Sequence, residues 1–226
     1  MSETIVRDEG VRTIFLSSRL DFDTVINPMA NRSYLFSFDE FHEGMPSKPR
    51  GVHEWNWSIP LSHLILLSGQ PRTYRSSLWK GKIAIVADYS PGVQRFLAFL
   101  RILEASGQLD KPKAFKKAAQ EAEKFLTVPK ERGRFLLLEP GEILAMGKDD
   151  LEKQNEKLVK SKIPTVTKQI DTVLTRQPEK LFQSAAGWLS AIRTEWNDSA
   201  LGLGSFSDVL YYQLDRSKDD DDDSDA

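Results

Sequence analysis

The pattern of apolar and polar positions predicts strands in the first and middle parts of the chain. Residues 11–17 and 33–38 are rich in β-branched and aromatic side chains, and in the second segment every other residue from Tyr34 onward is aromatic. Residues 83–87 form a continuous apolar run that ends in a turn. All three segments have the length and composition of strands.

Three other segments are predicted to be loops, edges or short strands. Residues 134–138 and 142–145 are separated by a proline–glycine pair, which is typical of a β-hairpin with a tight turn. Two glycines and two prolines between residues 43 and 59 predict a long loop that leads into a short edge strand. Residues 209–214 predict a last strand.

Apolar residues at helical spacing predict helices, most of them in the second half of the chain. A short helix is expected over residues 61–68. The next helix is apolar around most of its circumference, with Ser90 as N-cap, Pro91 at its first position and Gly107 at its end. Amphipathic helices are expected over 113–126, over 149–161 and 165–176 with a kink or break at Pro164, and over 179–196.

The order of these elements predicts an α+β fold, with a mixed or antiparallel sheet covered by helices and a helix-rich C-terminal half. A chain of 226 residues with 40% hydrophobic residues is long enough for one sizeable core. We therefore expect an N-terminal extension over residues 1–28 that contains the first strand, a single α+β domain over 29–216, and a disordered acidic tail over 217–226.

The net charge of −2 conceals an uneven distribution of charge. Six of the last eight residues are aspartates, so residues 1–218 carry 31 basic and 33 − 6 = 27 acidic side chains, a balance of +4. The chain has no cysteine, which excludes disulfides, thiolate metal sites and thiol nucleophiles. Acidic residues near the N-terminus argue against a signal peptide, and the longest apolar runs are far shorter than the ~20 residues of a membrane span. These features predict a cytoplasmic protein without a membrane partner.

The three histidines are the residues best suited to metal or acid–base chemistry. His42–Glu43 and His53–Glu54 offer imidazole and carboxylate ligands, but their spacing matches no metal motif that we know. His63 lies within an apolar segment, which predicts a hydrogen-bonded histidine of the core or its boundary. A metal-dependent hydrolase or small-ligand-binding enzyme that uses His42, His53 and nearby carboxylates stays open as an alternative.

Other catalytic and binding patterns are missing from the sequence. It contains neither a phosphate-binding glycine motif nor Gly-x-Ser-x-Gly, and the turn 88–92 is interpreted as strand-to-helix capping. Glu139 and Glu142 flank the predicted hairpin turn, where surface charges are expected. Basic residues between 111 and 168 alternate with acidic ones, as on a solvated helix surface, so nucleic-acid binding is not predicted. We assign no catalytic residue, cofactor or metal ligand and favour a protein that is not an enzyme.

Three tryptophans, Trp55, Trp57 and Trp79, lie in segments that resemble loops or edges. Such residues either cover the core or anchor an interface, because exposed tryptophan is unfavourable unless it contacts something. Together with the acidic and histidine pairs nearby, they suggest a surface for a protein partner. The predicted partner-binding residues are Glu40, His42, Glu43, His53, Glu54, Trp55 and Trp57.

From Met29 the chain reads Met-Ala-Asn-Arg-Ser-Tyr-Leu-Phe-Ser. This resembles the opening of a group of uncharacterised bacterial proteins that begin Met-Ala-Asn-Arg-Ser-Tyr-Leu-Tyr, although here residues 1–28 precede the motif. The resemblance implies no activity, but in size and lack of motifs the chain is similar to bacterial immunity proteins. Our leading hypothesis is an immunity protein that neutralises a cognate toxin domain through the 43–59 loop. A scaffold or regulator whose aspartate tail binds a basic partner is a further alternative.

Overall fold

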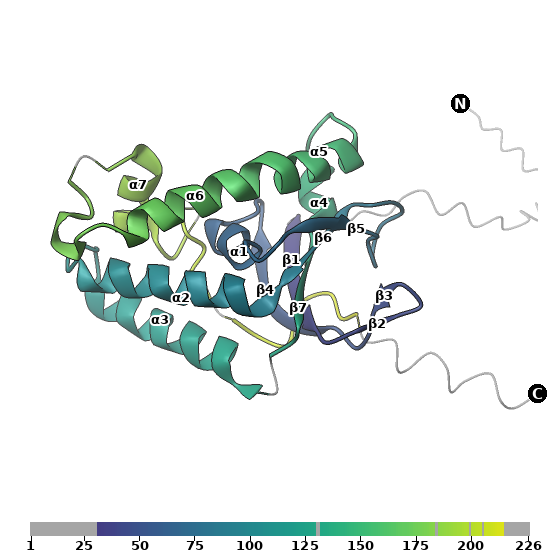
Figure 1. The fold of residues 1–226 in the computed structure, drawn as a ribbon, viewed down its shortest axis with the longest axis horizontal. Helices are drawn as coiled ribbons and strands as arrows, with labels where there is room; N and C mark the ends of the chain where they lie inside the picture. The colour runs from purple at the N-terminus through teal and green to yellow at the C-terminus, as the bar shows by residue number, and fades with distance from the viewer. Residues whose placement is uncertain (1–30, 130–131, 184, 199, 205, 215–226) are drawn as a thin grey trace, which may run out of the picture.

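A five-stranded sheet with helices packed against one face forms the centre of the computed structural model, which describes residues 31–129, 132–183, 185–198, 200–204 and 206–214 (Figure 1). The strand order is β4-β1-β7-β6-β5, and every neighbouring pair is antiparallel. The predicted α+β class is confirmed, with an antiparallel sheet. The strands are β1 (Arg32–Phe38), β4 (Arg50–Asn56), β5 (Arg72–Tyr74), β6 (Ala84–Asp88) and β7 (Phe135–Glu139).

The predicted strand over 11–17, the N-terminal extension and the aspartate tail lie outside the described residues. The predicted strand over 33–38 is confirmed as β1, and its alternation separates two cores. Tyr34, Phe36 and Phe38 belong to an apolar cluster on one face of the sheet, whereas Leu35 belongs to the larger cluster on the helix side. Both faces are buried because the second face is covered by loops, a hairpin and the segment around Leu210.

The larger core is built by helices that follow the predicted apolar stripes. Helix α2 carries nine buried residues and α3 packs alongside it (Figure 1). None of the helices in the described ranges is long and apolar enough to cross a membrane. The helices are α1 (Leu61–Leu66), α2 (Tyr89–Ala105), α3 (Pro112–Thr127), α4 (Gly141–Leu144), α5 (Leu151–Lys157), α6 (Ile163–Leu174) and α7 (Gly187–Glu195).

The start of α2 differs from the prediction. The N-cap is Asp88, not Ser90, and no side-chain capping bond is made. Strand β6 continues directly into the helix, and the junction is held by backbone bonds to distant segments. The amide of Asp88 donates to the carbonyl of Gly69 at 2.6 Å, and that of Tyr89 to the carbonyl of Arg134 at 3.1 Å. Tertiary hydrogen bonds therefore replace the local cap.

Pro164 neither breaks the helix nor leaves a gap in it. A π-helical turn, Leu158–Lys162, joins α5 to α6, and the proline lies in the first turn of α6. A π-turn bonds residues five apart, and its hydrogen-bonded ring is wider than that of an α-helix. The wider turn leaves room for the proline ring and tolerates the missing amide donor, both of which disturb a regular helix. The two predicted helices are therefore one continuous helical segment.

The predicted hairpin over 134–145 is wrong. Strand β7 lies in the middle of the sheet, between β1 and β6, so it has no free edge for a partner that follows it directly. Residues 141–144 instead form α4. Gly141 lets this turn approach the ring of Trp79, because a Cβ there would lie 2.3 Å from the indole nitrogen.

The predicted loop over 43–59 is also wrong for most of its length. A small hairpin pairs β2 (Phe41–His42) with β3 (Met45–Pro46), and its two turn residues, Glu43 and Gly44, have φ of 48° and 75°. Positive φ at both central residues gives a type I′ turn, which matches the twist of a hairpin. The remainder is the seven-residue strand β4, which is the edge of the sheet as expected.

Two predictions in the last part of the chain are wrong in extent or type. The helix expected over 179–196 is reduced to a 3₁₀ turn, Pro178–Lys180, and to α7, because Ala186 is extended with ψ of 151°. Residues 209–214 form no strand, since Val209 is 72% exposed and only Leu210 is buried. The apolar stripe of the predicted helix is nevertheless buried, at Leu181, Leu189, Ile192 and Trp196.

A buried asparagine fastens α5 to the start of β6, and its removal should be measurable. The amide of Asn155 donates to the carbonyls of Lys82 and Ala84, both at 3.0 Å, and the residue is fully buried. We expect Asn155→Ala to lower the free energy of unfolding by about 2 kcal/mol, because two buried acceptors lose their donor. Urea unfolding measures this, with the exposed Lys153→Ala as the control. Equal stabilities of the two variants would contradict the role of Asn155.

Candidate functional site

The structure divides the predicted partner-binding residues between the two ends of β1. Glu40, His42 and Glu43 belong to the β2–β3 hairpin, which packs against Phe38 through Phe41 at a ring distance of 4.9 Å. Glu54, Trp55 and Trp57 lie at the opposite end, because β4 pairs with the beginning of β1 there. At about 3.3 Å for each residue, a seven-residue strand separates the two groups by roughly 20 Å.

His53 is not part of a surface, which corrects its predicted role. A β-bulge near Val52 interrupts the pairing of β4 with β1. Val52 and His53 consequently both pack on the helix side, while Gly51 remains on the other face near Leu210. His53 is 1% exposed, so its ring is inaccessible to a partner, and it lies away from His42 on the hairpin.

His53 is instead the end of a buried hydrogen-bonded chain. The Ser33 hydroxyl donates to the carbonyl of Ser58 at 3.0 Å, so its oxygen accepts from Nδ1–H of His63 at 3.3 Å. The Nε2 atom of His63 then accepts from Nδ1–H of His53 at 2.8 Å. This pattern requires His63 to be neutral, because its Nε2 must accept a hydrogen bond. It also confirms the prediction that His63 is a hydrogen-bonded core histidine.

Burial keeps both imidazoles in this neutral form. It lowers the pKa of His53 from 6.5 to about 4 because no water solvates a charged ring there. The pKa of His63 is also well below 6.5, through burial and through the neighbouring His53. Among the described residues, no group of three or more histidine, aspartate or glutamate side chains could hold a metal ion.

The residues at the other end of β4 surround an open groove of about 530 Å³, here called the tryptophan groove. Its floor and walls come from the end of β4, the residues that follow it, and the turn after α7. Gly204 lies close to the ring of Trp55, since a Cβ there would be 3.1 Å from that ring. The groove is lined by Glu54, Trp55, Asn56, Trp57, Ser58 and Asp198.

Trp57 is the most unusual residue of this groove. Its side chain is 59% exposed, and its backbone has φ of 65°, a left-handed conformation that is rare for a large side chain. The amide of Trp57 donates to the carbonyl of Asn31 at 2.6 Å, which holds the turn in place. Of the two predicted roles for the tryptophans, Trp57 does not cover the core.

A chain of polar contacts connects the groove to further exposed aromatic residues. Glu54 lies 3.6 Å from the guanidinium of Arg32 and accepts from the amide of Tyr211 at 2.7 Å. The guanidinium carbon of Arg32 lies 4.3 Å from the centre of the Tyr211 ring. Tyr211 and Tyr212 are 60% and 47% exposed. This end of the sheet therefore presents three large aromatic side chains to solvent.

Sequence reasoning missed a buried carboxyl group on the same end of the sheet. Glu139 is 1% exposed, not on the surface, and accepts from the Ser76 hydroxyl at 2.6 Å and the Ser77 amide at 2.7 Å. Burial raises its pKa from 4.5 to about 7, although these two bonds oppose the change. The continuous apolar run before Glu139, which marks a central strand, was the available signal.

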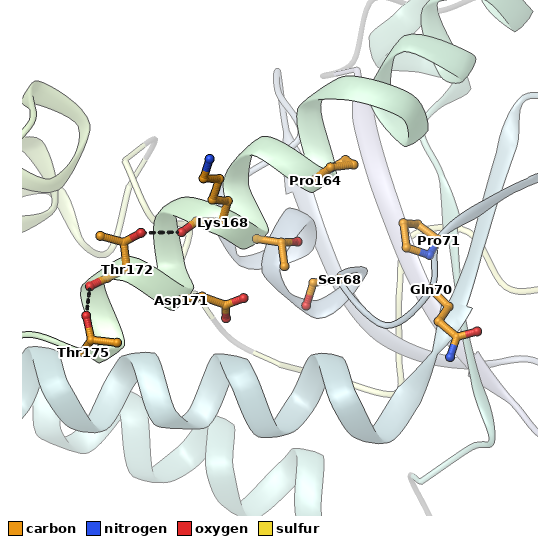
Figure 2. A pocket seen from close by; sticks show the side chains of 9 residues that line it. Ser68, Gln70, Pro71, Pro164, Lys168, Asp171, Thr172 and Thr175 are labelled. Carbon is orange, nitrogen blue, oxygen red and sulfur yellow. Dashed lines mark hydrogen bonds between the residues drawn. The ribbon is translucent and has the colours of Figure 1, made fainter.

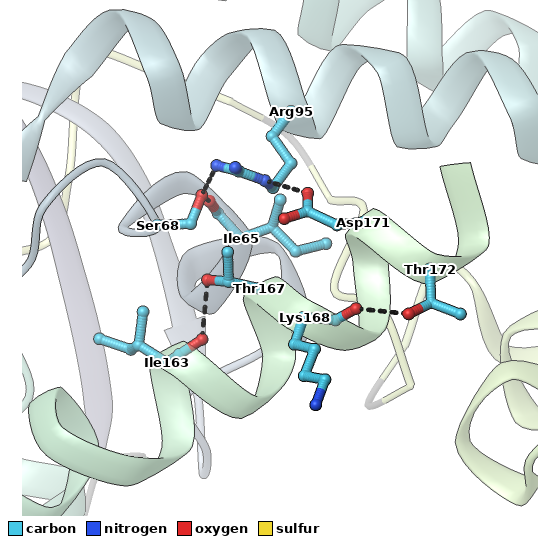
Figure 3. A network of polar contacts seen from close by, with 8 residues as sticks. All are labelled: Ile65, Ser68, Arg95, Ile163, Thr167, Lys168, Asp171 and Thr172. Atoms are coloured by element: carbon cyan, nitrogen blue, oxygen red, sulfur yellow. Dashed lines mark hydrogen bonds and ion pairs between the residues drawn. The ribbon is translucent and has the colours of Figure 1, made fainter. Parts of the chain in front are cut away.

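A second groove, of about 690 Å³, lies between the turn after α1 and helix α6 (Figure 2). Several of its polar groups are bonded within the fold. Arg95 reaches from α2 to the Ser68 hydroxyl at 2.7 Å and to Asp171 at 2.8 Å (Figure 3). The hydroxyls of Thr167 and Thr172 donate to carbonyls of their own helix, both at 2.8 Å. We therefore interpret this groove as a junction that joins α1, α2 and α6.

Comparison with known proteins finds one family. The model of a domain of unknown function, DUF7822, matches residues 40–180, more than half of the 226. The match includes Glu54, Trp55 and Trp57 of the tryptophan groove and ends before Asp198. No curated protein and no solved structure matches the chain.

Proposed function

The chain belongs to the DUF7822 family of domains of unknown function, and from this starting point we propose that it is a protein-binding module, specifically an immunity protein. In this proposal it acts in the cytoplasm and neutralises a cognate toxin domain by binding it. The contact surface is the end of the sheet that carries the tryptophan groove and the exposed tyrosines. The hairpin with Glu40, His42 and Glu43 lies outside that surface.

The exposure of Trp57 is the observation that carries this proposal. A left-handed backbone at a non-glycine residue costs of order 1–3 kcal/mol, and exposing an indole forgoes the stabilisation of burying it. Within the described fold, more than half of the surface of Trp57 remains in solvent. A binding partner would gain from burying this surface, because tryptophan and tyrosine at the centre of an interface contribute much of its affinity.

The alternatives receive less support from the geometry. A metal-dependent enzyme would need His42 and His53 together, but they lie on different elements and His53 is bonded to His63 inside the core. A scaffold that acts through its aspartate tail depends on residues outside the described ranges. The observed surface therefore favours direct binding of a folded protein.

The proposal is tested by co-expression with the product of the adjacent gene, because immunity proteins are encoded beside their toxins. We expect the wild-type chain to form a complex and to restore growth when that product is toxic. Trp57→Ala should weaken the complex at least about 30-fold, since central tryptophans of interfaces contribute about 2 kcal/mol or more. Calorimetry with the purified proteins measures this change.

His42→Ala is the matched control at the other end of β1. Its side chain is exposed and belongs to the hairpin, so we expect unchanged affinity and growth. Loss of binding with His42→Ala and not with Trp57→Ala would move the interface to the hairpin. Absence of any complex with products of the neighbouring genes would contradict the immunity function itself.

A further inference from the structure

The lining of the tryptophan groove combines aromatic surface with negative charge. Glu54 and Asp198 contribute carboxylates, Trp55 and Trp57 contribute indole rings, and none of the lining residues within the described ranges is basic. The faces of indole rings attract cations, and carboxylates form strong charge-assisted hydrogen bonds with them. The groove is therefore complementary to a positively charged group.

The two carboxylates differ in how far they are already used. Glu54 accepts from the amide of Tyr211 and pairs with Arg32. Asp198 is exposed, and its carboxylate has no hydrogen bond or ion pair with any residue that the structure describes. Asp198 is thus the anion available to a ligand, at the side of the groove formed by the turn after α7.

The larger groove beside α6 has a different charge pattern. Its lining contains both Lys168 and Asp171, and Asp171 is already paired with Arg95 (Figures 2 and 3). A cation would find no unpaired carboxylate there among the described lining residues. Of these two grooves, the tryptophan groove is therefore the better match for a positive charge.

We propose that the tryptophan groove receives an arginine side chain of the protein partner, an inference that rests on the proposed function. A guanidinium is planar, so it can stack on an indole and at the same time donate two hydrogen bonds to one carboxylate. Trp57 supplies the stacking surface and Asp198 the acceptor. Arginine is also among the residues that contribute most to interfaces.

The test uses the full-length ¹⁵N-labelled chain and two short peptides. The probe is acetyl-Gly-Gly-Arg-Gly-Gly-amide, and the control peptide has citrulline, the uncharged analogue, in place of arginine. We expect the indole N–H signal of Trp57, assigned with Trp57→Phe, to shift with half-saturation on the order of 1 mM, as suits a single side chain. The citrulline peptide should leave it unchanged, and equal shifts with both would overturn the proposal.

Two aspartate variants separate a specific contact from general attraction. Asp198→Asn should weaken arginine-peptide binding about fivefold, the loss of roughly one surface ion pair. Asp208→Asn removes the same charge from an exposed residue outside the groove lining and should leave binding unchanged. The role of Asp198 would be overturned if both variants weakened binding equally, or if neither variant weakened it. The other signals of each variant spectrum verify that it is folded.

The peptide titration and the co-expression experiment distinguish failure of the arginine inference from failure of the proposed function. If Trp57→Ala weakens the protein complex but the arginine peptide does not bind, the protein-binding function stands and the arginine inference is wrong. If the peptide binds as expected but no protein complex depends on Trp57, the groove recognises arginine and the proposed interface is wrong.

Discussion

Replacing Gly92 with alanine should destabilise the protein by at least about 4 kcal/mol or prevent folding altogether. Gly92 lies in the first turn of α2, where that helix crosses α1. A Cβ atom there would be 1.7 Å from the carbonyl oxygen of Leu66 and 2.6 Å from its carbon, and both are backbone atoms. The two helices would have to separate, which opens the core that they share, and effects of this size are rare for single substitutions.

The sign of this effect makes the test decisive. In an unobstructed helix, glycine to alanine stabilises by up to about 1 kcal/mol, since alanine has the higher helix propensity. Gly187→Ala is the matched control, because it begins α7 and a Cβ there has no neighbour within 4 Å. Urea unfolding or soluble yield measures both variants. A Gly92→Ala protein as stable as Gly187→Ala would contradict the close contact between α1 and α2.

Glu139→Gln should change the pH dependence of stability by about 2 to 3 kcal/mol between pH 4.5 and 7. The pKa of Glu139 is about 7 in the folded protein and 4.5 ordinarily, so the folded state binds more protons in this interval. Its contribution to stability is full below pH 4.5 and is lost as the pH rises toward 7. One pKa unit corresponds to about 1.4 kcal/mol, which gives the stated size.

His53 acts in the opposite direction over nearly the same interval. Its pKa is about 4 in the fold and 6.5 ordinarily, so the unfolded state binds more protons between these values. Stability from the neutral histidine chain is full above pH 6.5 and is lost as the pH falls toward 4. His63 acts in the same direction as His53, because its pKa is also lowered in the fold. Glu139 opposes both histidines in the wild-type protein, and Glu139→Gln removes that opposing contribution.

Urea unfolding at intervals of about half a pH unit between pH 4.5 and 7 measures the free energy of unfolding of the wild type and of Glu139→Gln as a function of pH. We expect the stability of Glu139→Gln to rise with pH relative to that of the wild type. A constant difference is expected in addition, because glutamine has one acceptor oxygen and cannot accept from both the Ser76 hydroxyl and the Ser77 amide. His42→Gln, which alters an exposed histidine, should follow the wild-type profile. Parallel profiles for Glu139→Gln and wild type would show that Glu139 does not titrate in this range.

Much of the fold could be predicted from local patterns. The alternation in β1, the apolar run of β6 and the stripes of α2 and α3 are consequences of side-chain periodicity, which any segment carries within itself. The burial of His63 also followed from its apolar neighbours. Pro164 marked the correct position along the chain, although a π-turn and not a break accommodates it.

The candidate site could be predicted only in part. Glu54, Trp55 and Trp57 were identified as an unusual group, but the same reasoning joined them with His53 and with the hairpin residues. Sequence proximity suggested one surface, whereas pairing with β1 carries the two groups to opposite ends of a strand. Asp198 was not predicted at all, since it is more than 140 residues away from Glu54 in the chain.

What the sequence determined by itself was therefore the type of most elements, because this depends on residues within a few positions of each other. Tertiary structure alone decided that β7 lies between β1 and β6, and that a bulge turns His53 inward while Trp57 stays in solvent. These outcomes depend on strand partners and covering segments that lie far apart in the chain. The exposure of a residue depends on all its neighbours in space, whereas local periodicity reflects only its neighbours along the chain.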